Sequence, residues 1–373
     1  ALLSESREFE RGVTAAVNAS VQPLLERYVQ SLANALRDKG YQNELLVMNG
    51  NGGMVPASQV STEAVKTVMS GPASGVMAAV ATGRRAGIPN LITYDMGGTS
   101  TDVALIKNAR APVSNEIEIE YAMPIHVPMV DVRTVGAGGG SIARVDASGM
   151  LRVGPHSAGS VPGPICYGKG GTEPTISDAN LLLGRLPVAR FGTHKDELSA
   201  IFETKIGKPL GLGPEAAAEA VIHIANTHMA GAIRMVSLSL GADPRDYALF
   251  AFGGAGPLHA TALAAELGIP RVLVPARPGM TNALGCVVAD LRHDTVRTLN
   301  RPLDVVDMAD VHNILADQIA IGTDRIHAAG IKLTKIQMEL SVDMQFIGQT
   351  HLLRVPLHNA KPTREDLQQR FEA

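Results

Sequence analysis

Apolar residues recur at helical spacing in some parts of the chain and gather in short runs in others. Val29, Leu32 and Leu36 belong to a pattern that predicts one helix over residues 1–40. Further helices, the first two of them separated by a break at residues 70–72, are expected at 61–69, 73–85, 214–240, 257–267, 282–291 and 308–329. Strands are expected at 44–48, 91–96, 102–106, 129–135, 142–145, 150–153, 247–252, 271–274, 336–346 and 351–355. Strands that alternate with helices indicate an α/β protein.

The composition excludes several classes of protein. Hydrophobic residues make up 45% of the 373 and charged residues 18%, which predicts a folded globular chain. The net charge of −3 argues against a nucleic-acid partner, and no apolar run reaches the roughly 20 residues of a membrane span. Two cysteines cannot form a disulfide framework, so a reducing, cytoplasmic setting is expected. The 38 glycines suit an α/β protein that binds phosphates with its main chain.

The first glycine motif lies between two expected strands and begins and ends with a carboxylate, Asp95 and Asp102. It also contains two glycines and three hydroxyl residues, which are Gly97, Gly98, Thr99, Ser100 and Thr101. The glycines allow backbone N–H groups to point at an anion, and the carboxylates can hold hydrated Mg²⁺ or position a water. The alternative is an ordinary hairpin turn with Asx hydrogen bonds. The full string favours phosphate binding.

The second motif joins an expected strand to an expected helix, and it consists of Gly253, Gly254, Ala255 and Gly256. A strand, a glycine turn and a helix in this order are typical of nucleotide binding at a helix N-terminus.

The third motif, at residues 136–141, is also rich in glycine and includes Gly138 and Gly139. A dinucleotide-binding fingerprint would need glycine at Ser141 and a helix directly afterwards, whereas a strand is expected there. A glycine-rich wall of a nucleotide or substrate cleft fits better. The alternative is a packed corner between strands.

Several single residues lie close to these glycine-rich segments. A metal could be bound where several of these side chains converge, although no spacing is diagnostic. The candidate ligands are Asp95, Asp131, His156 and Asp178, together with His126.

Two further residues have two interpretations each. Cys166 is either a nucleophile or, more in keeping with its setting, a small buried residue. His259 either acts as a base or metal ligand or merely packs within its helix.

The strings that carry chemistry occur in one order along the chain. They are Ser70-Gly-Pro-Ala-Ser-Gly75, Asp95-Met-Gly-Gly-Thr-Ser-Thr-Asp102, Gly136-Ala-Gly-Gly-Gly-Ser141, Pro162-Gly-Pro-Ile-Cys-Tyr-Gly168, Thr175-Ile-Ser-Asp-Ala-Asn180, Phe252-Gly-Gly-Ala-Gly-Pro-Leu-His259 and Gly348-Gln349. In this combination, essentially the whole chain resembles the hydantoinase A/oxoprolinase family. That family includes the nucleotide-binding subunits of ATP-dependent hydantoinases and of acetone-type carboxylases.

The resemblance implies an actin-like ATPase (ribonuclease H-like) α/β fold, with mixed sheets flanked by helices. ATP and Mg²⁺, or another divalent metal, would bind in the cleft between two lobes. By matching motif, residues 95–102 would be the second phosphate loop and residues 253–256 the adenosine motif. Residues 282–290 would be the connecting helix between the lobes.

Two departures from the family pattern affect the expected organisation. Family members carry an earlier Asp-x-Gly-Gly-Thr loop, and a single such string occurs here, so the fold is expected to be incomplete at the N-terminus. The chain also begins inside the family pattern, at Ser6-Arg-Glu-Phe-Glu-Arg11, and stops soon after the tail strands, so it is expected to be the middle section of a longer protein or one product of a split gene. The expected domains are an ATPase core at 1–300, with a glycine-rich insertion at 110–185, and a truncated helix-and-strand region at 301–373. Thr281-Asn282 also stands where relatives often have Ser-Ala.

The resemblance further implies ATP-dependent hydrolysis of a cyclic amide of the hydantoin or oxoproline type, with Asp95 and Asp102 as catalytic residues. The implied partners are a hydantoinase B-like subunit, a segment that carries the missing phosphate loop and a small-molecule substrate. No nucleic acid or membrane is expected. The alternatives are a beta-type subunit of an ATP-dependent acetone- or acetophenone-type carboxylase, and a non-catalytic module that binds a partner. A sugar kinase fits the 136–141 and 162–168 segments less well.

Overall fold

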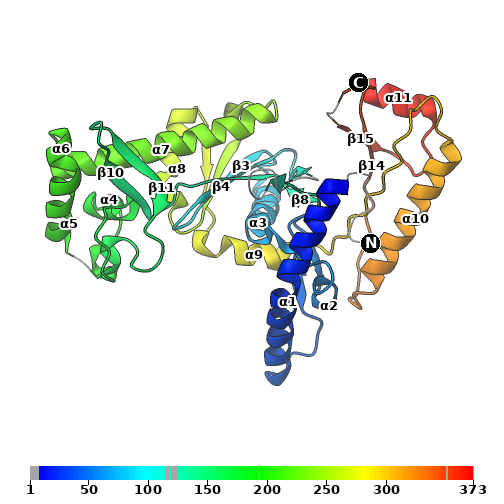
Figure 1. Ribbon diagram of the computed structural model, residues 1–373, viewed down its shortest axis with the longest axis horizontal. Helices are drawn as coiled ribbons and strands as arrows, with labels where there is room; N and C mark the ends of the chain where they lie inside the picture. Colours follow the sequence, from blue (N-terminus) through cyan, green and yellow to red (C-terminus); the bar gives the residue numbers. More distant parts are fainter. Residues whose placement is uncertain (1–7, 115–116, 119–123, 193, 350–351, 373) are drawn as a thin grey trace. The chain divides into compact units, whose positions relative to one another are not determined.

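The computed structural model describes residues 8–114, 117–118, 124–192, 194–349 and 352–372 (Figure 1). By their internal contacts these residues form two units. Unit 1 comprises the described parts of Ala1–Val68, Ser114–Met129 and Asp290–Ala373, and unit 2 those of Met69–Val113 and Val130–Ala289. The last boundary between the units lies between Ala289 and Asp290. The domain division expected at residue 300 stays a prediction.

A five-stranded mixed sheet lies at the centre of unit 2 (Figure 1). Its order is β13-β12-β3-β4-β9, with bounds Arg271–Leu273, Ala248–Phe252, Leu91–Met96, Thr101–Ile106 and Val132–Val135. β12 runs parallel to β13 and β3, whereas β4 pairs antiparallel with β3 and β9. The predicted α/β class with a mixed sheet is confirmed.

Helices cover both faces of this sheet because its strands are apolar on both sides. Neighbouring side chains of a strand point to opposite faces, and in β3 both Leu91 and Ile92 are fully buried. α3 (Ser70–Ala86) packs on the Leu91 face, and α7 (Pro214–Ser239) with α8 (Gly256–Leu267) packs on the Ile92 face.

A short helix, α9 (Thr281–Val288), packs closely on α3 (Figure 1). At Gly285 the two backbones meet, because an added Cβ would overlap the carbonyl oxygen of Ser74. One helical turn before Gly285, α9 carries Asn282, whose carboxamide lies against Gly75 of α3. Small residues therefore hold α9 in a fixed position beside the sheet.

The remainder of unit 2 includes the predicted hairpin and a group of short helices. The hairpin is formed by β10 (Ser141–Val145) and β11 (Leu151–Ser157), and it is confirmed. Three helices that the apolar pattern did not predict are α4 (Ile176–Leu182), α5 (Lys195–Phe202) and α6 (Lys208–Leu210).

The described part of unit 1 contains one long helix near its start, three antiparallel strand pairs and a C-terminal helical region. Its helices are α1 (Glu8–Asp38), α2 (Ala57–Val60), α10 (Met308–His327) and α11 (Arg364–Glu372). Its antiparallel pairs are β1 (Leu46–Met48) with β2 (Met54–Pro56), β6 (Ile117–Glu118) with β7 (Pro124–Ile125), and β14 (Leu340–Met344) with β15 (Leu353–Leu357). Two further strands, β5 (Val113–Ser114) and β8 (Met129–Val130), stand where the chain passes between the units. None of the described helices has the length and hydrophobicity that a bilayer crossing needs.

Two predictions from the apolar pattern are wrong. Pro72 lies in the first turn of α3 and does not break a helix, because no backbone N–H is required at this position. The helix predicted at 61–69 is a single 3₁₀ turn, Ala64–Thr67. The Asn18 carboxamide accepts a hydrogen bond from the N–H of Val65 at 3.0 Å, so a contact with α1 replaces a regular helical start.

Most of the other predicted elements are observed. The helix predicted at 1–40 begins in the described part of the chain at Glu8, and residues 1–7 lie outside the described residues. The strand predicted at 351–355 corresponds to β15, and residue 351 also lies outside them.

Candidate functional site

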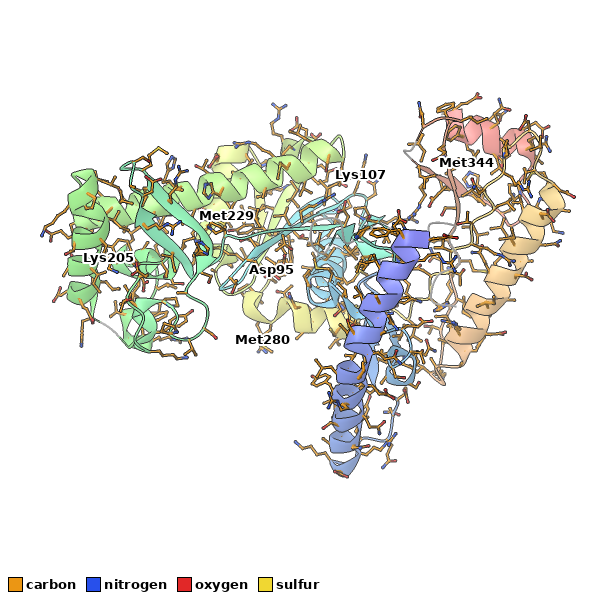
Figure 2. All side chains as sticks on the ribbon, viewed as in Figure 1. Asp95, Lys107, Lys205, Met229, Met280 and Met344 are labelled. Atoms are coloured by element: carbon orange, nitrogen blue, oxygen red, sulfur yellow. The ribbon has the colours of Figure 1, made fainter. Side chains whose placement is uncertain are left out.

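Asp95 lies at the carboxyl end of β3, where the parallel strand β12 also ends (Figure 2). The strand register places Asp95 beside Phe252 of β12 and opposite Asp102 of β4. Every other residue of β3 is buried, whereas Asp95 is partly exposed. Ligand sites of α/β folds lie outside the carboxyl ends of the strands, so this edge is the candidate site.

The turn between β3 and β4 offers open backbone next to the two carboxylates. The N–H of Gly97 donates to the carbonyl of Ser100 at 3.0 Å and closes the turn. Gly98 and Thr99 are exposed, and an added Cβ on Gly98 would meet no atom within 4 Å. A small anion can therefore approach the main chain here.

Burial raises the pKa of both carboxyl groups. For Asp95, a hydrogen bond from Asn282 lowers the pKa and the charge of Asp102 raises it, and the net shift is upward. For Asp102, a hydrogen bond from Thr134 lowers the pKa but does not offset burial. A cation would stabilise both ionised carboxylates. Mg²⁺ is commonly bound through one or two carboxylates with several waters retained, so this donor set fits it.

The glycine loop at 136–141 supports the turn from beneath. The N–H of Gly139 donates to the carbonyl of Gly97 at 3.0 Å, and the N–H of Gly140 donates to that of Gly98 at 2.6 Å. A Cβ on Gly138 would lie 2.6 Å from the backbone nitrogen of Thr99. Gly138 and Gly139 are both buried, so the structure places them behind the turn and not on an exposed wall.

Thr101 also belongs to this support. Its side chain is fully buried, and its hydroxyl donates to the carbonyl of Ala137 at 2.5 Å. The hydroxyl therefore ties β4 to the glycine loop.

The second glycine motif meets the first through main-chain contacts. The N–H of Ala255 donates to the carbonyl of Met96 at 3.0 Å. Gly253 has a φ of +80°, and a Cβ there would overlap a carboxylate oxygen of Asp95. Gly254 is exposed with no atom within 4 Å of an added Cβ, whereas Gly256 is buried in the first turn of α8. Gly254 is thus the part of this motif that is open to a ligand.

Asn282 is a site residue that the motifs did not reveal. Its side-chain nitrogen donates to Oδ2 of Asp95 at 3.1 Å. The sequence marked Asn282 only as a departure from the family pattern. The contact joins two residues that are far apart in sequence, so no local signal could have found it.

We expect Asn282→Ala to move the acid limb of the pH–kcat profile of the assembled enzyme to higher pH. Removal of a hydrogen bond to the ionised carboxylate raises the pKa of Asp95, and such a bond corresponds to about one pKa unit. Asn282→Ser retains a hydroxyl donor and serves as the conservative control. An unchanged acid limb in Asn282→Ala would show that this contact does not affect Asp95 in catalysis.

The structure does not bring the proposed metal ligands together. Asp131 forms an ion pair with Arg133 at 3.4 Å, and His156 is exposed on β11. His126 belongs to unit 1, whereas Asp95 and the other candidates belong to unit 2. Among the described residues, no group of three or more His, Cys, Asp or Glu side chains could hold a metal ion.

Asp178 instead has a structural role. Its carboxylate accepts hydrogen bonds from the N–H of Cys166 at 2.7 Å and from the hydroxyl of Thr175 at 2.8 Å. With Thr175 it forms the capping box of α4. The spacing Thr-x-x-Asp at 175–178 is the sequence signal for this role.

Cys166 and His259 are both buried. Burial and the neighbouring Asp178 charge raise the pKa of the Cys166 thiol, which disfavours a thiolate nucleophile. Burial lowers the pKa of His259 to about 4, so the ring is neutral at pH 7. Its Nδ1 lies 2.8 Å from the Asn226 carboxamide oxygen, and its Nε2 lies 3.3 Å from the side-chain nitrogen of Asn180. Both residues therefore act in packing.

Comparisons with known proteins point to one family. The model of the hydantoinase/oxoprolinase family matches residues 11–295. The chain is 38% identical over 370 residues to caprolactamase subunit alpha of Pseudomonas jessenii, which covers 97% of this chain and 53% of the relative. It is 33% identical over 388 residues to the acetophenone carboxylase gamma subunit of Aromatoleum aromaticum, which covers 100% of this chain and 52% of the relative.

A solved structure agrees with these relatives. The crystal structure of ATP-dependent caprolactamase from Pseudomonas jessenii superposes with a TM-score of 0.86 at 37% identity, over 98% of this chain and 54% of that one. The match confirms the predicted actin-like ATPase class of fold. The chain spans about half the length of the curated relatives it matches. With the family match over residues 11–295, the chain belongs to the hydantoinase/oxoprolinase family.

Proposed function

We propose that this chain is the nucleotide-binding part of an enzyme that uses ATP to hydrolyse a cyclic amide, such as a lactam, a hydantoin or an oxoproline. The observation that carries the proposal is the open turn at residues 97–100, which stands between Asp95 and Asp102 and is held from beneath by the 136–141 loop. The identity of 38% to a caprolactamase subunit supports a cyclic amide as the substrate class.

The chemistry overcomes the poor reactivity of an amide carbonyl. The carbonyl oxygen attacks the γ-phosphorus of ATP, ADP leaves, and the carbonyl carbon now bears a good leaving group. Water then attacks this carbon, and the C–N bond of the ring breaks as the nitrogen takes up a proton and leaves as the amine, which gives an acyl phosphate. A second water hydrolyses the acyl phosphate to the carboxylate and phosphate. Positioning and charge stabilisation are the main contributions that a protein makes to such a transfer.

The residues of the site have distinct tasks in this scheme. The backbone N–H groups of Gly98 and Thr99 orient the transferred phosphoryl group, and Gly97 holds this backbone in place through its hydrogen bond to Ser100. Gly254 allows the nucleotide to approach the start of α8. Asp95 and Asp102 would hold Mg²⁺ or orient the attacking group. Bound Mg²⁺ supplies charge neutralisation at the phosphates.

The partners belong to the same proposal. Two relatives are named as subunits, and the chain spans about half of each. We infer that a hydantoinase B-like subunit hydrolyses the activated ring, and that a further segment supplies an earlier phosphate loop.

The test is activity of the assembled complex on a panel of substrates. Caprolactam, hydantoin and 5-oxoproline are compared with acetone and acetophenone, with and without bicarbonate, while ADP release is measured. ATP-dependent ring opening supports the proposal. Ketone-dependent and bicarbonate-dependent ADP release would instead support a carboxylase subunit, which the 33% identity to the acetophenone carboxylase gamma subunit favours as the second candidate. An assembly that binds no nucleotide would indicate a non-catalytic module.

We expect Gly254→Val to weaken nucleotide binding by the assembled enzyme at least tenfold while the melting temperature changes by less than a few degrees. Gly254 has open space around it, so the branched side chain disturbs no packing but blocks the approach of a ligand. Calorimetric titration with ATP and thermal unfolding measure the two effects. Nucleotide binding equal to that of the parent would exclude Gly254 from the site.

A further inference from the structure

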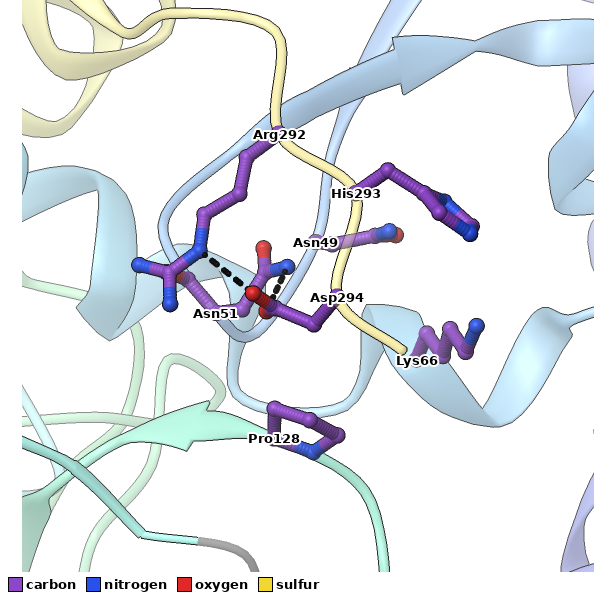
Figure 3. A pocket seen from close by; sticks show the side chains of 7 residues that line it. All are labelled: Asn49, Asn51, Lys66, Pro128, Arg292, His293 and Asp294. Carbon is purple, nitrogen blue, oxygen red and sulfur yellow. Dashed lines mark hydrogen bonds and ion pairs between the residues drawn. The ribbon is translucent and has the colours of Figure 1, made fainter. Parts of the chain in front are cut away.

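A second polar site lies in unit 1, where the loop between β1 and β2 meets the segment that follows residue 290 (Figure 3). It is a small cavity of about 10 Å³, lined by Asn49, Asn51, Lys66, Pro128, Arg292, His293 and Asp294. A volume of this order accommodates about one water-sized group. No residue of the nucleotide site takes part in it.

One side of the cavity is fixed by interactions of its own. The side-chain nitrogen of Asn51 donates to Asp294 at 2.8 Å, and Nε of Arg292 donates to the same carboxylate at 3.1 Å (Figure 3). Arg292 also donates to the carbonyl of Asn51 at 3.2 Å. A Cβ on Gly53 would overlap Cβ of Arg292, so the two chain segments are in close contact. The side chains of Asn51, Arg292 and Asp294 therefore use their hydrogen-bonding groups on one another, and together they form one wall of the cavity.

Asn49 differs from this wall. The residue is only 5% exposed, and its carboxamide points into the cavity (Figure 3). No hydrogen bond joins this carboxamide to any side chain or backbone group in the described part of the chain. The amide atoms of Asn49 are not sealed from solvent, so they stay available to a water or a ligand at the cavity.

The charge on the other side of the cavity is positive. Lys66 and Arg325 share a single carboxylate, that of Glu63, at 2.6 and 2.7 Å. Although burial raises the pKa of Glu63, these two cations bring it below its usual value. One positive charge therefore remains in excess beside the cavity, since Arg292 is paired with Asp294.

The positive charges also affect the pKa of His293. Burial, then Arg325 and Lys66, lower its pKa to about 4, and the charges of Glu63 and Asp294 offset this only in part. The imidazole is thus neutral at pH 7 and can donate one hydrogen bond. In Figure 3 its ring, the Asn49 carboxamide and the Lys66 ammonium lie on the same side of the cavity.

We propose that Asn49, Lys66 and His293 bind one oxygen of a small oxyanion, either inorganic phosphate or a carboxylate. The amide and imidazole donate hydrogen bonds to this oxygen, and the ammonium supplies the charge. The rest of the ion stays at the mouth of the cavity, because the enclosed volume holds one oxygen only.

The test uses the ring signals of histidine in the full chain labelled with ¹³C-histidine, at pH 7 and constant ionic strength. Phosphate, formate and chloride are titrated separately, and the His293 signal reports on this cavity alone. We expect phosphate, formate or both to shift the His293 signal in a saturable way, while chloride does not. A response to phosphate alone or to formate alone identifies the source of the oxyanion. His259 is buried against Asn180 and Asn226, and its signal is the internal control.

Variants connect the shift to the proposed residues. Lys66→Gln should raise the apparent Kd roughly tenfold or more, because a charge-assisted contact is lost. Asn49→Asp keeps the size of the side chain but repels an anion, and it should abolish the response. Lys332→Gln removes an equal charge from an exposed position of unit 1 and should bind as the parent does.

Three outcomes would overturn the proposal. The first is a shift of the His293 signal by chloride equal to that by the oxyanions, and the second is an unchanged shift in Asn49→Asp. The third is no shift in the parent with either oxyanion, which would mean that the cavity holds only water. None of these readouts involves ATP turnover, so failure here leaves the proposed enzymatic function untouched.

Discussion

Replacement of Asp95 by asparagine is expected to lower ATP turnover by the assembled enzyme by at least tenfold. Asn keeps the size of the side chain and can still contact Asn282, but it removes the charge that faces the turn at 97–100. The loss of one charge-assisted contact is worth roughly 1.5–3 kcal/mol, or about 10- to 150-fold in rate. ATP affinity should change less than turnover, because the glycine backbone that receives the phosphates is intact.

Steady-state ADP release, measured with ATP titrations, separates these two effects. Asp246→Asn is the matched control, since Asp246 is exposed at the opposite end of β12 and should leave turnover unchanged. Turnover of Asp95→Asn within twofold of the parent would reduce Asp95 to a residue that only caps the turn.

Gly285→Ala should produce a large loss of stability. The added methyl group would overlap the Ser74 carbonyl oxygen, and this oxygen belongs to the backbone of α3, which cannot rotate away. We expect the free energy of unfolding to fall by at least about 3 kcal/mol, at the upper end of the range for overpacked cores. Because α9 also carries Asn282, its displacement should weaken the contact with Asp95 as well.

Urea unfolding measures this loss, and Gly231→Ala is the matched control. Gly231 also lies within a helix of unit 2, but an added Cβ there would meet no atom within 4 Å. Alanine at this position should leave stability unchanged or raise it by up to about 1 kcal/mol. Equal stabilities of the two variants would show that α3 and α9 can separate at little cost.

The parts of the site that could be predicted from sequence are those set by local chemistry. The short apolar runs on either side of Gly97 and Gly98 predict two strands, and a carboxylate at each end of the turn follows directly from the sequence. The β10–β11 hairpin and α7 were predictable for the same reason, because each is encoded by a continuous pattern of apolar residues in one segment of the chain. The roles of Asp95 and Asp102 in catalysis stay predictions.

The remainder depended on contacts between distant segments. The Asn282–Asp95 hydrogen bond joins positions 187 residues apart, and the burial of Gly138 depends on the 97–100 turn that covers it. Proximity to glycine-rich loops was a poor guide to metal ligands, because Asp178 is used for capping α4. Pro72 was misread because proline ends helices in the interior but is accepted in the first turn.

β12 reaches the middle of the unit 2 sheet late in synthesis. It lies between β13 and β3, yet the ribosome delivers it only after the hairpin, the short helices and α7. Until then the nascent chain exposes β3, whose buried residues are almost all apolar, as an unpaired edge. Such edges recruit other strands, so chaperone binding during translation would protect this interval. A recombinant fragment that ends before Ala248 would keep the same edge permanently and should precipitate.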